Sequence, residues 1–288
     1  MATSADVMHS AMNDPKLSII IPVLDDGIVL HHLIVQLGAQ SLQGVEIIVA
    51  DGGSKDGSQS LAHQLGVRVV VSDPGRGRQM NAASREARGQ QLLFLHADSH
   101  LPHARFLEDA FNFMAPILSA QPRTAGHFSL RFVDPPRGRE WLMKFWEEKT
   151  RCNRPESIHG DQGLWISRPF FAEIGGFDTT YPFLEERRVV QEVSRLGQWV
   201  VLPGPLGTSA RRFCTEGLAR RTLLNALIMV CHELAWHEFL QQAPDLYRQQ
   251  SALTNTQSTR PSEQQKSKPL GLRPKPRWEG ETPSQTHP

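Results

Sequence analysis

The chain has 288 residues and a nearly balanced charge, with 31 Lys and Arg residues against 30 Asp and Glu residues. This balance produces no strong single-sign field, which argues against a nucleic-acid-binding protein. Cys152, Cys214 and Cys231 are odd in number and far apart, so they indicate a reducing compartment rather than a disulfide framework or a metal knuckle. Residues 1–16 lack the apolar core of a signal peptide, and no apolar stretch is long enough to cross a bilayer. We therefore expect a cytoplasmic protein with one large α/β domain or two small ones.

Strand and helix patterns alternate over the first part of the chain. Apolar runs predict strands over residues 17–21, 45–50, 67–71 and 92–95. Helical spacing predicts helices over residues 28–37, 58–65 and 79–87. Pro22 closes the first strand, and we expect a loop over residues 73–78. Strands that alternate with helices predict a parallel sheet with right-handed crossovers.

The second part of the chain is less regular. We expect strands over residues 125–132, 163–167 and 199–202, and helices over residues 139–150, 184–196 and 217–240. The last helix carries an apolar stripe that follows several arginines, so it would lie on an anionic bilayer or pack on the domain or on a partner subunit. The composition predicts a disordered tail over residues 251–288, and residues 1–16 are expected to be a flexible N-terminus.

Polar side chains follow the apolar run at residues 92–95. Ligands of open α/β sheets bind at the carboxyl ends of the strands, where His96 and Asp98 would emerge. Asp98 is a hard oxygen donor, suited to Mg²⁺ or Mn²⁺ that carry phosphate oxygens. The alternative is that His96 and Asp98 form only a turn before a helix that follows Pro102.

The end of the second strand carries an acid and two glycines. Asp51 could accept a hydrogen bond from a nucleotide base or ribose, and Gly52 would let the ligand approach the backbone. An ordinary strand-to-helix turn is the alternative. Residues 22–26 replace the glycine-rich dinucleotide fingerprint after the first strand, which counts against a nicotinamide oxidoreductase.

Basic and acidic groups complete the candidate site. The glycine-rich segment 75–81 carries Arg76 and Arg78 and could cradle a diphosphate, although a solvated basic loop is the alternative. Asp161, Glu185 or Glu186 could act as a general base, but the last two also suit the first turn of a helix.

A histidine pair near the end of the last predicted helix looks like part of a zinc-protease signature. His232 and His237 are five residues apart, which rotates the second about 140° from the first on a helix. A zinc site needs its histidines at i and i+4, so we interpret these residues as surface or packing histidines.

Taken in order, these segments resemble the family 2 glycosyltransferases, which have the GT-A fold. The matching segments are residues 19–26, 51–57, 75–81, 95–98, 160–163, 175–177, 184–186 and 209–213. The chain looks most similar to a bacterial subgroup with His-Ala-Asp, here residues 96–98, in place of Asp-x-Asp. The resemblance implies a GT-A-type single α/β domain over residues 17–240, with a mostly parallel twisted sheet flanked by helices.

The resemblance also implies a function and a set of site residues. It implies metal-assisted transfer of a hexosyl group, with inversion, from a nucleotide-diphosphate sugar to a hydroxyl acceptor. Asp98 would hold Mg²⁺ or Mn²⁺ and, through the metal, the diphosphate. The residues expected around the substrates are Pro22, Asp25, Asp26, Asp51, Gly52, Arg76, Arg78, Asn81, His96, Gln162, Arg211 and Arg212.

The resemblance departs from the family pattern at the catalytic pair. The family's usual Glu-Asp pair is Glu185-Glu186 here, so Glu186, the expected base, is one methylene longer. Asp161 is the nearest alternative base, and Arg187 and Arg188 stand where relatives tend to carry another acid. An inactive sugar-nucleotide-binding protein and a nucleotidyltransferase are therefore the alternative functions. The sugar, the acceptor and the oligomeric state are left open.

Overall fold

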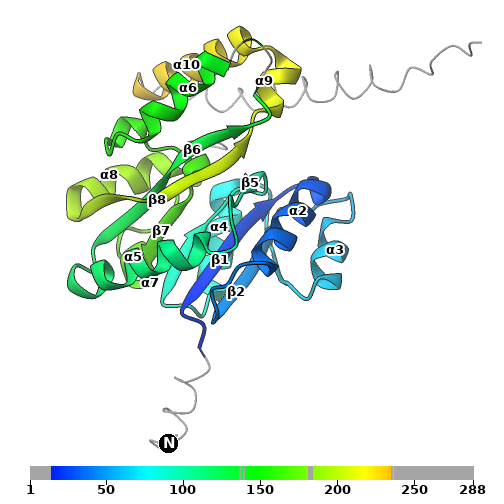
Figure 1. The fold of residues 1–288 in the computed structure, drawn as a ribbon, viewed down its shortest axis with the longest axis vertical. Coiled ribbons are helices and arrows are strands. Elements are labelled where there is room, and N and C mark those ends of the chain that lie inside the picture. Colours follow the sequence, from blue (N-terminus) through cyan, green and yellow to red (C-terminus); the bar gives the residue numbers. More distant parts are fainter. Residues whose placement is uncertain (1–13, 136–137, 139, 181–183, 235, 237–288) are drawn as a thin grey trace, which may run out of the picture.

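The structure, a computed structural model, describes residues 14–135, 138, 140–180, 184–234 and 236. Within these residues one eight-stranded sheet has the order β3-β2-β1-β4-β7-β6-β8-β5 (Figure 1). Its strands are β1 (Leu17–Val23), β2 (Val45–Asp51), β3 (Arg68–Val71), β4 (Gln91–Phe94), β5 (Ser99–His100), β6 (Thr124–Val133), β7 (Leu164–Ser167) and β8 (Gln198–Ser209).

The sheet is parallel over its first half and mixed over its second half. Strand β1 pairs in parallel with β2 and β4, β2 with β3, and β6 with β8. Strand β7 lies antiparallel between β4 and β6, and β5 is antiparallel to β8. The predicted mostly parallel sheet of an α/β domain is therefore confirmed.

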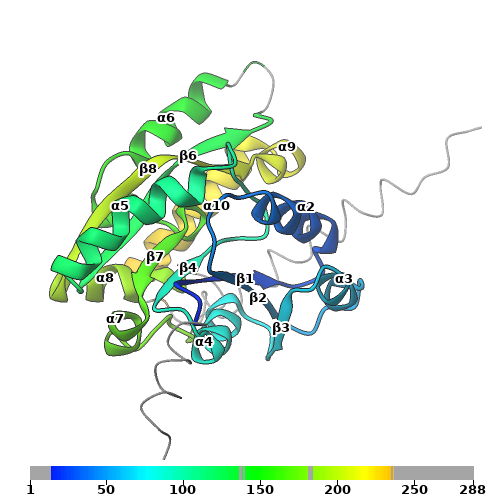
Figure 2. The same cartoon turned by 60° about the horizontal axis from the view of Figure 1, so that its bottom comes forward.

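Helices cover both faces of the sheet. They are α2 (Gly27–Gly38), α3 (Ser58–Gln64), α4 (Arg76–Glu86), α5 (Phe106–Ala120), α6 (Glu140–Thr150), α7 (Arg168–Glu173), α8 (Glu186–Leu196), α9 (Arg211–Glu216) and α10 (Leu218–Glu233). In Figure 2, α2 and α5 lie above the sheet and α4 and α7 lie below it. Ile19 and Ile21 belong to one apolar cluster and Ile20 to the other, because successive strand side chains point to opposite faces.

Some element boundaries differ from those predicted. Helix α4 begins at Arg76, inside the segment expected to be a loop, and β1 continues through Pro22 to Val23. Strand β8 continues to Ser209, well beyond the predicted end at Leu202, because it pairs with β6 past an irregularity at residues 127–129. The sequence indicated only that a helix could follow Pro102, and α5 lies there over Phe106–Ala120.

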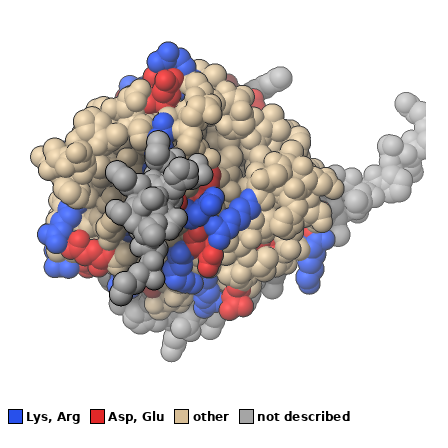
Figure 3. All heavy atoms as spheres, turned by 90° about the horizontal axis from the view of Figure 1, so that it is seen from below, with Lys and Arg blue, Asp and Glu red and all other residues tan. Residues whose placement is uncertain are grey.

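Other expectations concern the ends of the chain. The flexible segment expected at residues 1–16 is described only from residue 14, and the tail at residues 251–288 lies outside the described residues. So do His237 and the end of the predicted helix at residues 237–240. Among the described helices, none has the length and apolar character needed to cross a membrane. Seen from below, acidic and basic side chains are interspersed on the visible surface (Figure 3).

Candidate active site

The candidate site lies at the carboxyl ends of β1, β2 and β4. Parallel register brings these ends together, with Val23 opposite Asp51 and Ile20 opposite Phe94. The predicted strand-end residues Asp51, His96 and Asp98 therefore lie along one edge of the sheet. This is the edge at which open α/β sheets bind ligands.

Asp51 is fully buried and is held in place by the turn that follows it. Its Oδ2 accepts hydrogen bonds from the backbone of Gly53 at 2.8 Å, from the backbone of Ser54 at 3.0 Å and from Nε2 of Gln59 at 2.6 Å. Its Oδ1 is buried and has no hydrogen-bond partner among the described residues. A buried carboxylate oxygen without a partner can accept a hydrogen bond from an N–H or O–H group of a ligand.

Gln79 fixes the geometry of this edge, although sequence reasoning did not select it. Its buried amide nitrogen donates to the carbonyls of Val23 and Ala50, both at 2.7 Å, and its Oε1 accepts from the backbone of Gly75 at 3.3 Å. One side chain thus joins the ends of β1 and β2 to the first turn of α4. The motif contained Gln79, but nothing in the sequence showed that these long-range backbone groups would meet it.

Asp25 joins the loops after β1 and β2. Its backbone has a φ of 52°, a left-handed conformation that is uncommon outside glycine. Its amide donates to the hydroxyl of Ser54 at 3.0 Å, and its Oδ1 accepts from the backbone of Lys55 at 2.6 Å. Asp25 is therefore used to shape the edge in this structure.

Asp26 pairs with Arg211, the first residue of α9. Arg211 Nη1 lies 3.2 Å from Asp26 Oδ1, and a second hydrogen bond joins Nη2 to Oδ2. The hydrogen bond to Asp26 raises the pKa of Arg211 against the effect of burial, and the charge of Asp98 adds to the rise. Two predicted substrate residues, far apart in the sequence, therefore meet at the edge of the site.

The guanidinium group of Arg76 also lies among acidic residues. Arg76 Nε is 3.0 Å from Oε1 of Glu185, whose side chain is only 3% exposed. The charge of Glu185 raises the pKa of Arg76 against burial, and the charges of Glu186, Asp98 and Asp161 contribute further. Glu185 is therefore the buried partner of Arg76, and its role as a catalytic group stays a prediction.

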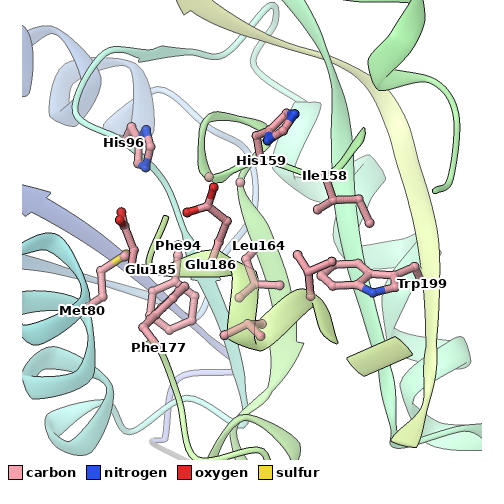
Figure 4. Close-up of a pocket in the computed structure, with 14 residues that line it drawn as sticks. Met80, Phe94, His96, Ile158, His159, Leu164, Phe177, Glu185, Glu186 and Trp199 are labelled. Carbon is pink, nitrogen blue, oxygen red and sulfur yellow. The ribbon is translucent and has the colours of Figure 1, made fainter. Parts of the chain in front are cut away.

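Glu186 has different surroundings from Glu185. It begins α8 and lines a small cavity whose other walls are largely apolar, including Phe94, Leu164 and Trp199. Burial raises the pKa of Glu186 to about 7, and the charge of Glu185 adds to this effect. In Figure 4 the carboxylates of Glu185 and Glu186 point toward the side of the cavity where two histidines lie.

Gly160 lies beside both Glu186, the candidate base, and His96, which follows β4. A methyl group on Gly160 would lie 3.1 Å from His96 Nε2 and 3.7 Å from Glu186 Oε2. Both polar groups therefore lie against the same stretch of backbone, and a side chain at position 160 would intrude on them. His159, on the same wall, has its pKa lowered to about 4 by burial, with Lys149 and Arg187 contributing, so its ring is neutral at pH 7.

Residues 18–175, more than half of the chain, match the glycosyl transferase family 2 pattern. The chain belongs to glycosyl transferase family 2. This membership and the sheet-edge position of the acids agree with the family inferred from the motifs. The match includes the segments around Asp51, Arg76 and Asp98 and ends before Glu186.

Curated relatives match this chain over limited lengths. A dolichol-phosphate mannosyltransferase of Mycosarcoma maydis is 30% identical over 110 residues, which cover 33% of this chain and 37% of that protein. A PGL/p-HBAD biosynthesis glycosyltransferase of Mycobacterium bovis BCG is 35% identical over 100 residues, which cover 32% of this chain and 39% of that protein. The chain thus spans about two fifths of the length of these relatives.

Solved structures of low identity share the fold. Mannosyltransferase PcManGT from Pyrobaculum calidifontis, solved with GDP-Man and Mn²⁺, has a TM-score of 0.51 at 18% identity, covering 68% of this chain and 56% of that chain. TarS of S. aureus has a TM-score of 0.55 at 16% identity, covering 68% and 37%. These similarities confirm the predicted GT-A-type fold.

The candidate site offers few side chains that could bind a metal ion. No group of three or more His, Cys, Asp or Glu side chains in the described part of the chain could hold a metal ion. Mg²⁺ is commonly bound through one or two carboxylates together with substrate phosphates. Asp98 fits such a site, because burial and then the charge of Asp98 raise the pKa of Asp161 to about 6, and a cation would relieve this repulsion.

Two predicted substrate residues are used inside the protein instead. Asn81 donates to the carbonyl of Phe177 at 2.9 Å and accepts from the amide of Phe177 at 3.0 Å, so both of its polar atoms hold that backbone. Gln162 is fully buried, donates to the carbonyl of Ser157 at 2.8 Å and accepts from the amide of His159 at 3.3 Å. Both side chains thus help to shape the site, and their direct contact with a substrate stays a prediction.

The remaining predicted residues lie at the margins of the site. Pro22 is buried within β1, and Arg78 is exposed in the first part of α4. Gly52 packs on Gln79, whose Cδ would lie 3.0 Å from an added methyl group. The side chain of Arg212 is outside what the structure describes. Roles for Arg78 and Arg212 toward a diphosphate stay predictions.

Proposed function

We propose that this protein transfers a hexosyl group from a nucleotide-diphosphate sugar to a hydroxyl acceptor, with inversion at the anomeric carbon. The observation that carries the proposal is Glu186, a carboxylate with a pKa of about 7 that lies, like His96, beside Gly160 at the ligand-binding edge of the sheet. Family 2 membership and relatives named mannosyltransferase and glycosyltransferase support it. We place the catalytic domain at residues 17–240 and the protein in the cytoplasm.

The donor would be held by groups on both sides of the strand ends. The free Oδ1 of Asp51 accepts a hydrogen bond from the nucleotide base or ribose. Arg211 and the exposed Arg78 supply positive charge for the diphosphate, and Arg76 balances the nearby carboxylates. Asp98 would hold Mg²⁺ or Mn²⁺, which supplies Lewis-acid stabilisation of the leaving group when bound.

Glu186 takes the acceptor's proton in this proposal. The acceptor oxygen forms a bond to the anomeric carbon, the bond from that carbon to the diphosphate oxygen breaks, and the bonding electrons leave with the diphosphate. The hydroxyl proton moves to the Glu186 carboxylate. One displacement from the face opposite the leaving group inverts the anomeric carbon. A pKa near 7 suits a general base, because it joins a substantial ionised fraction to a strong driving force for proton transfer.

The proposal is tested by substituting the base. We expect Glu186→Gln to lower turnover at least ~100-fold with little change in donor affinity, since a general base acts in the transition state. Release of nucleoside diphosphate from UDP-sugars and GDP-sugars measures turnover, and calorimetry measures donor binding. Glu192→Gln is the matched control, because Glu192 lies on the same helix in a surface ion pair with Arg195.

The other outcomes separate the alternatives. Release of pyrophosphate from a nucleoside triphosphate supplied with a sugar 1-phosphate would identify a nucleotidyltransferase. Donor binding without turnover would identify an inactive binding protein. If Asp161→Asn abolishes turnover and Glu186→Gln does not, the base is Asp161.

The metal assignment has its own test. Asp98→Ala should remove the metal dependence of nucleoside diphosphate binding and leave the melting temperature unchanged, because Asp98 is the acid that follows β4 at this edge. Calorimetry with and without Mn²⁺ measures the effect. An unchanged metal-dependent affinity would contradict the assignment.

A further inference from the structure

Helix α10 exposes several large apolar side chains. Its exposed side chains include Leu223, 72% exposed, Leu227, 42%, Val230, 54%, and the stripe ends at Leu234, 70%. Their spacing places them along one face of the helix. On the inner face Ile228 and Cys231 are buried. A helix that only packed on its own domain would have its large apolar side chains on the inner face.

A second helix at the same end also exposes large apolar residues. Helix α6 carries Trp141, 70% exposed, and Phe145, 63% exposed, one helical turn apart. Helices α6, α9 and α10 all lie at the upper end of the molecule in Figure 1. Single exposed apolar residues are normal, but several at one end of the molecule mark an interaction surface.

The charge next to the α10 stripe is positive on balance. Arg220 is exposed one turn before Leu223, and the sequence adds Arg212 and Arg221, against Glu216 and Glu233. The charge of α6 is mixed, with Glu140, Glu147 and Glu148 against Lys144 and Lys149. Basic residues beside an apolar stripe complement anionic lipid headgroups, at about 1 kcal/mol for each residue near the surface. Exposed Trp side chains also suit the membrane interface.

We propose that this apolar end docks on the surface of an anionic lipid membrane. We define the apolar end by the exposed side chains of Trp141, Phe145, Leu223, Leu227, Val230 and Leu234. The helices would lie on the membrane surface in this proposal, and none of the described helices could span a bilayer. A second copy is the weaker occupant, because it would bring the same arginines to the contact, whereas lipid phosphates neutralise them.

Docking at this end would keep the candidate site close to the membrane. Helix α9 precedes α10 directly, and its first residue, Arg211, pairs with Asp26 at the edge of the site. The apolar end therefore continues from the site through one short helix. An acceptor or product at the bilayer surface would be within reach of this arrangement, although membrane binding itself does not depend on the proposed transfer.

Co-sedimentation of the full-length chain with vesicles tests the proposal. We expect binding to vesicles of phosphatidylcholine with phosphatidylglycerol, weakened by salt, and at least ~tenfold weaker binding for the double variant L223E/L227E. Both positions are exposed, so the variant should fold, and an unchanged melting temperature checks this. V35E is the matched control, because Val35 is 53% exposed on α2 and lies outside the apolar end.

Three results would overturn the proposal. The first is the absence of binding to anionic vesicles. The second is equal binding by the native chain and L223E/L227E, or equal binding of the native chain to vesicles of phosphatidylcholine alone. The third is self-association without lipid that L223E/L227E abolishes in light scattering, which would assign the apolar end to a second copy.

Discussion

Glu185 and Glu186 are adjacent and chemically identical, yet the structure gives them different surroundings. Glu185 is buried and its carboxylate contacts Arg76 at 3.0 Å, which compensates its charge. Glu186 lines a largely apolar cavity, where burial raises its pKa to about 7. A carboxyl group whose pKa is raised toward 7 by burial suits acid–base chemistry. Asp161 is the alternative base, because burial and the charge of Asp98 raise its pKa to about 6.

The pKa of Glu186 predicts a pH dependence of activity. The folded pKa is above the usual carboxyl value, so the base is protonated below about pH 7 and ionised above it. We expect kcat/KM for the donor to rise with pH through about 7 and then level off, since kcat/KM reports the free enzyme. The kcat profile should have a lower midpoint, because a bound cation favours the ionised carboxylate.

Initial rates between mild acid and mild alkali measure both profiles. Glu192→Gln should leave them unchanged, because Glu192 pairs with Arg195 on the surface. A kcat/KM that is constant well below pH 7 would contradict the assignment of Glu186.

At the scale of elements, α4 is the piece that assembles the site. Its first turn carries Arg76, Gln79 ties it to the ends of β1 and β2, and Asn81 holds the backbone of Phe177. Gly77 lets α4 approach the segment before α8, because an added methyl group would lie 2.5 Å from the carbonyl oxygen of Asp178. The Arg76–Glu185 pair depends on this approach.

We predict that Gly77→Ala is destabilising. The methyl group would meet backbone that cannot move aside without shifting the segment before Glu185, at a cost of about 1–3 kcal/mol. Turnover should also fall, since the Arg76–Glu185 pair and Glu186 follow that segment. Urea unfolding and the nucleoside diphosphate assay measure the two effects.

Gly38→Ala is the control in another helix. Gly38 ends α2 and an added methyl group would meet no atom within 4 Å. Alanine should leave stability unchanged or raise it by about 0.5–1 kcal/mol, because glycine is a weak helix former. Equal effects at the two positions would show that the close approach at Gly77 is unimportant.

At the scale of the whole molecule, the Asp26–Arg211 pair joins the first βα loop to the helices that follow the last strand. Both side chains are partly exposed, at 31% and 41%, so the pair should contribute less than about 1 kcal/mol to stability. Its effect is to hold the start of α9 beside the strand ends. The same connection leads to the apolar end on α10.

We predict that Arg211→Ala separates binding from stability. Donor affinity should fall at least ~tenfold through the loss of one diphosphate-binding cation, a charge-assisted contact. The free energy of unfolding should change by less than about 1 kcal/mol. Arg195→Ala removes a surface ion pair near the C-terminal end of α8 and should alter neither donor affinity nor the free energy of unfolding measurably. Unchanged donor affinity in Arg211→Ala would remove Arg211 from the donor site.

The sequence by itself determined the strands of the first half and the position of the acids at their ends. Buried parallel strands require continuous apolar runs, and the residues that follow such runs emerge at one edge of the sheet. For this reason the apolar runs alone were enough to predict that Asp51, His96 and Asp98 follow the ends of strands. The order of the motifs then identified the family.

Only the tertiary structure decided which polar residues face a ligand and which hold the backbone. Gln79, Asn81 and Gln162 bind carbonyl and amide groups of other segments, and such contacts leave no periodic signal in the sequence. Local propensity also disfavoured a helix at Gly77, where α4 packs closely on the backbone of Asp178. Glu185 and Glu186 differ for the same reason: a carboxylate's role depends on its neighbours in space, and only folding brought Arg76 to one of the two.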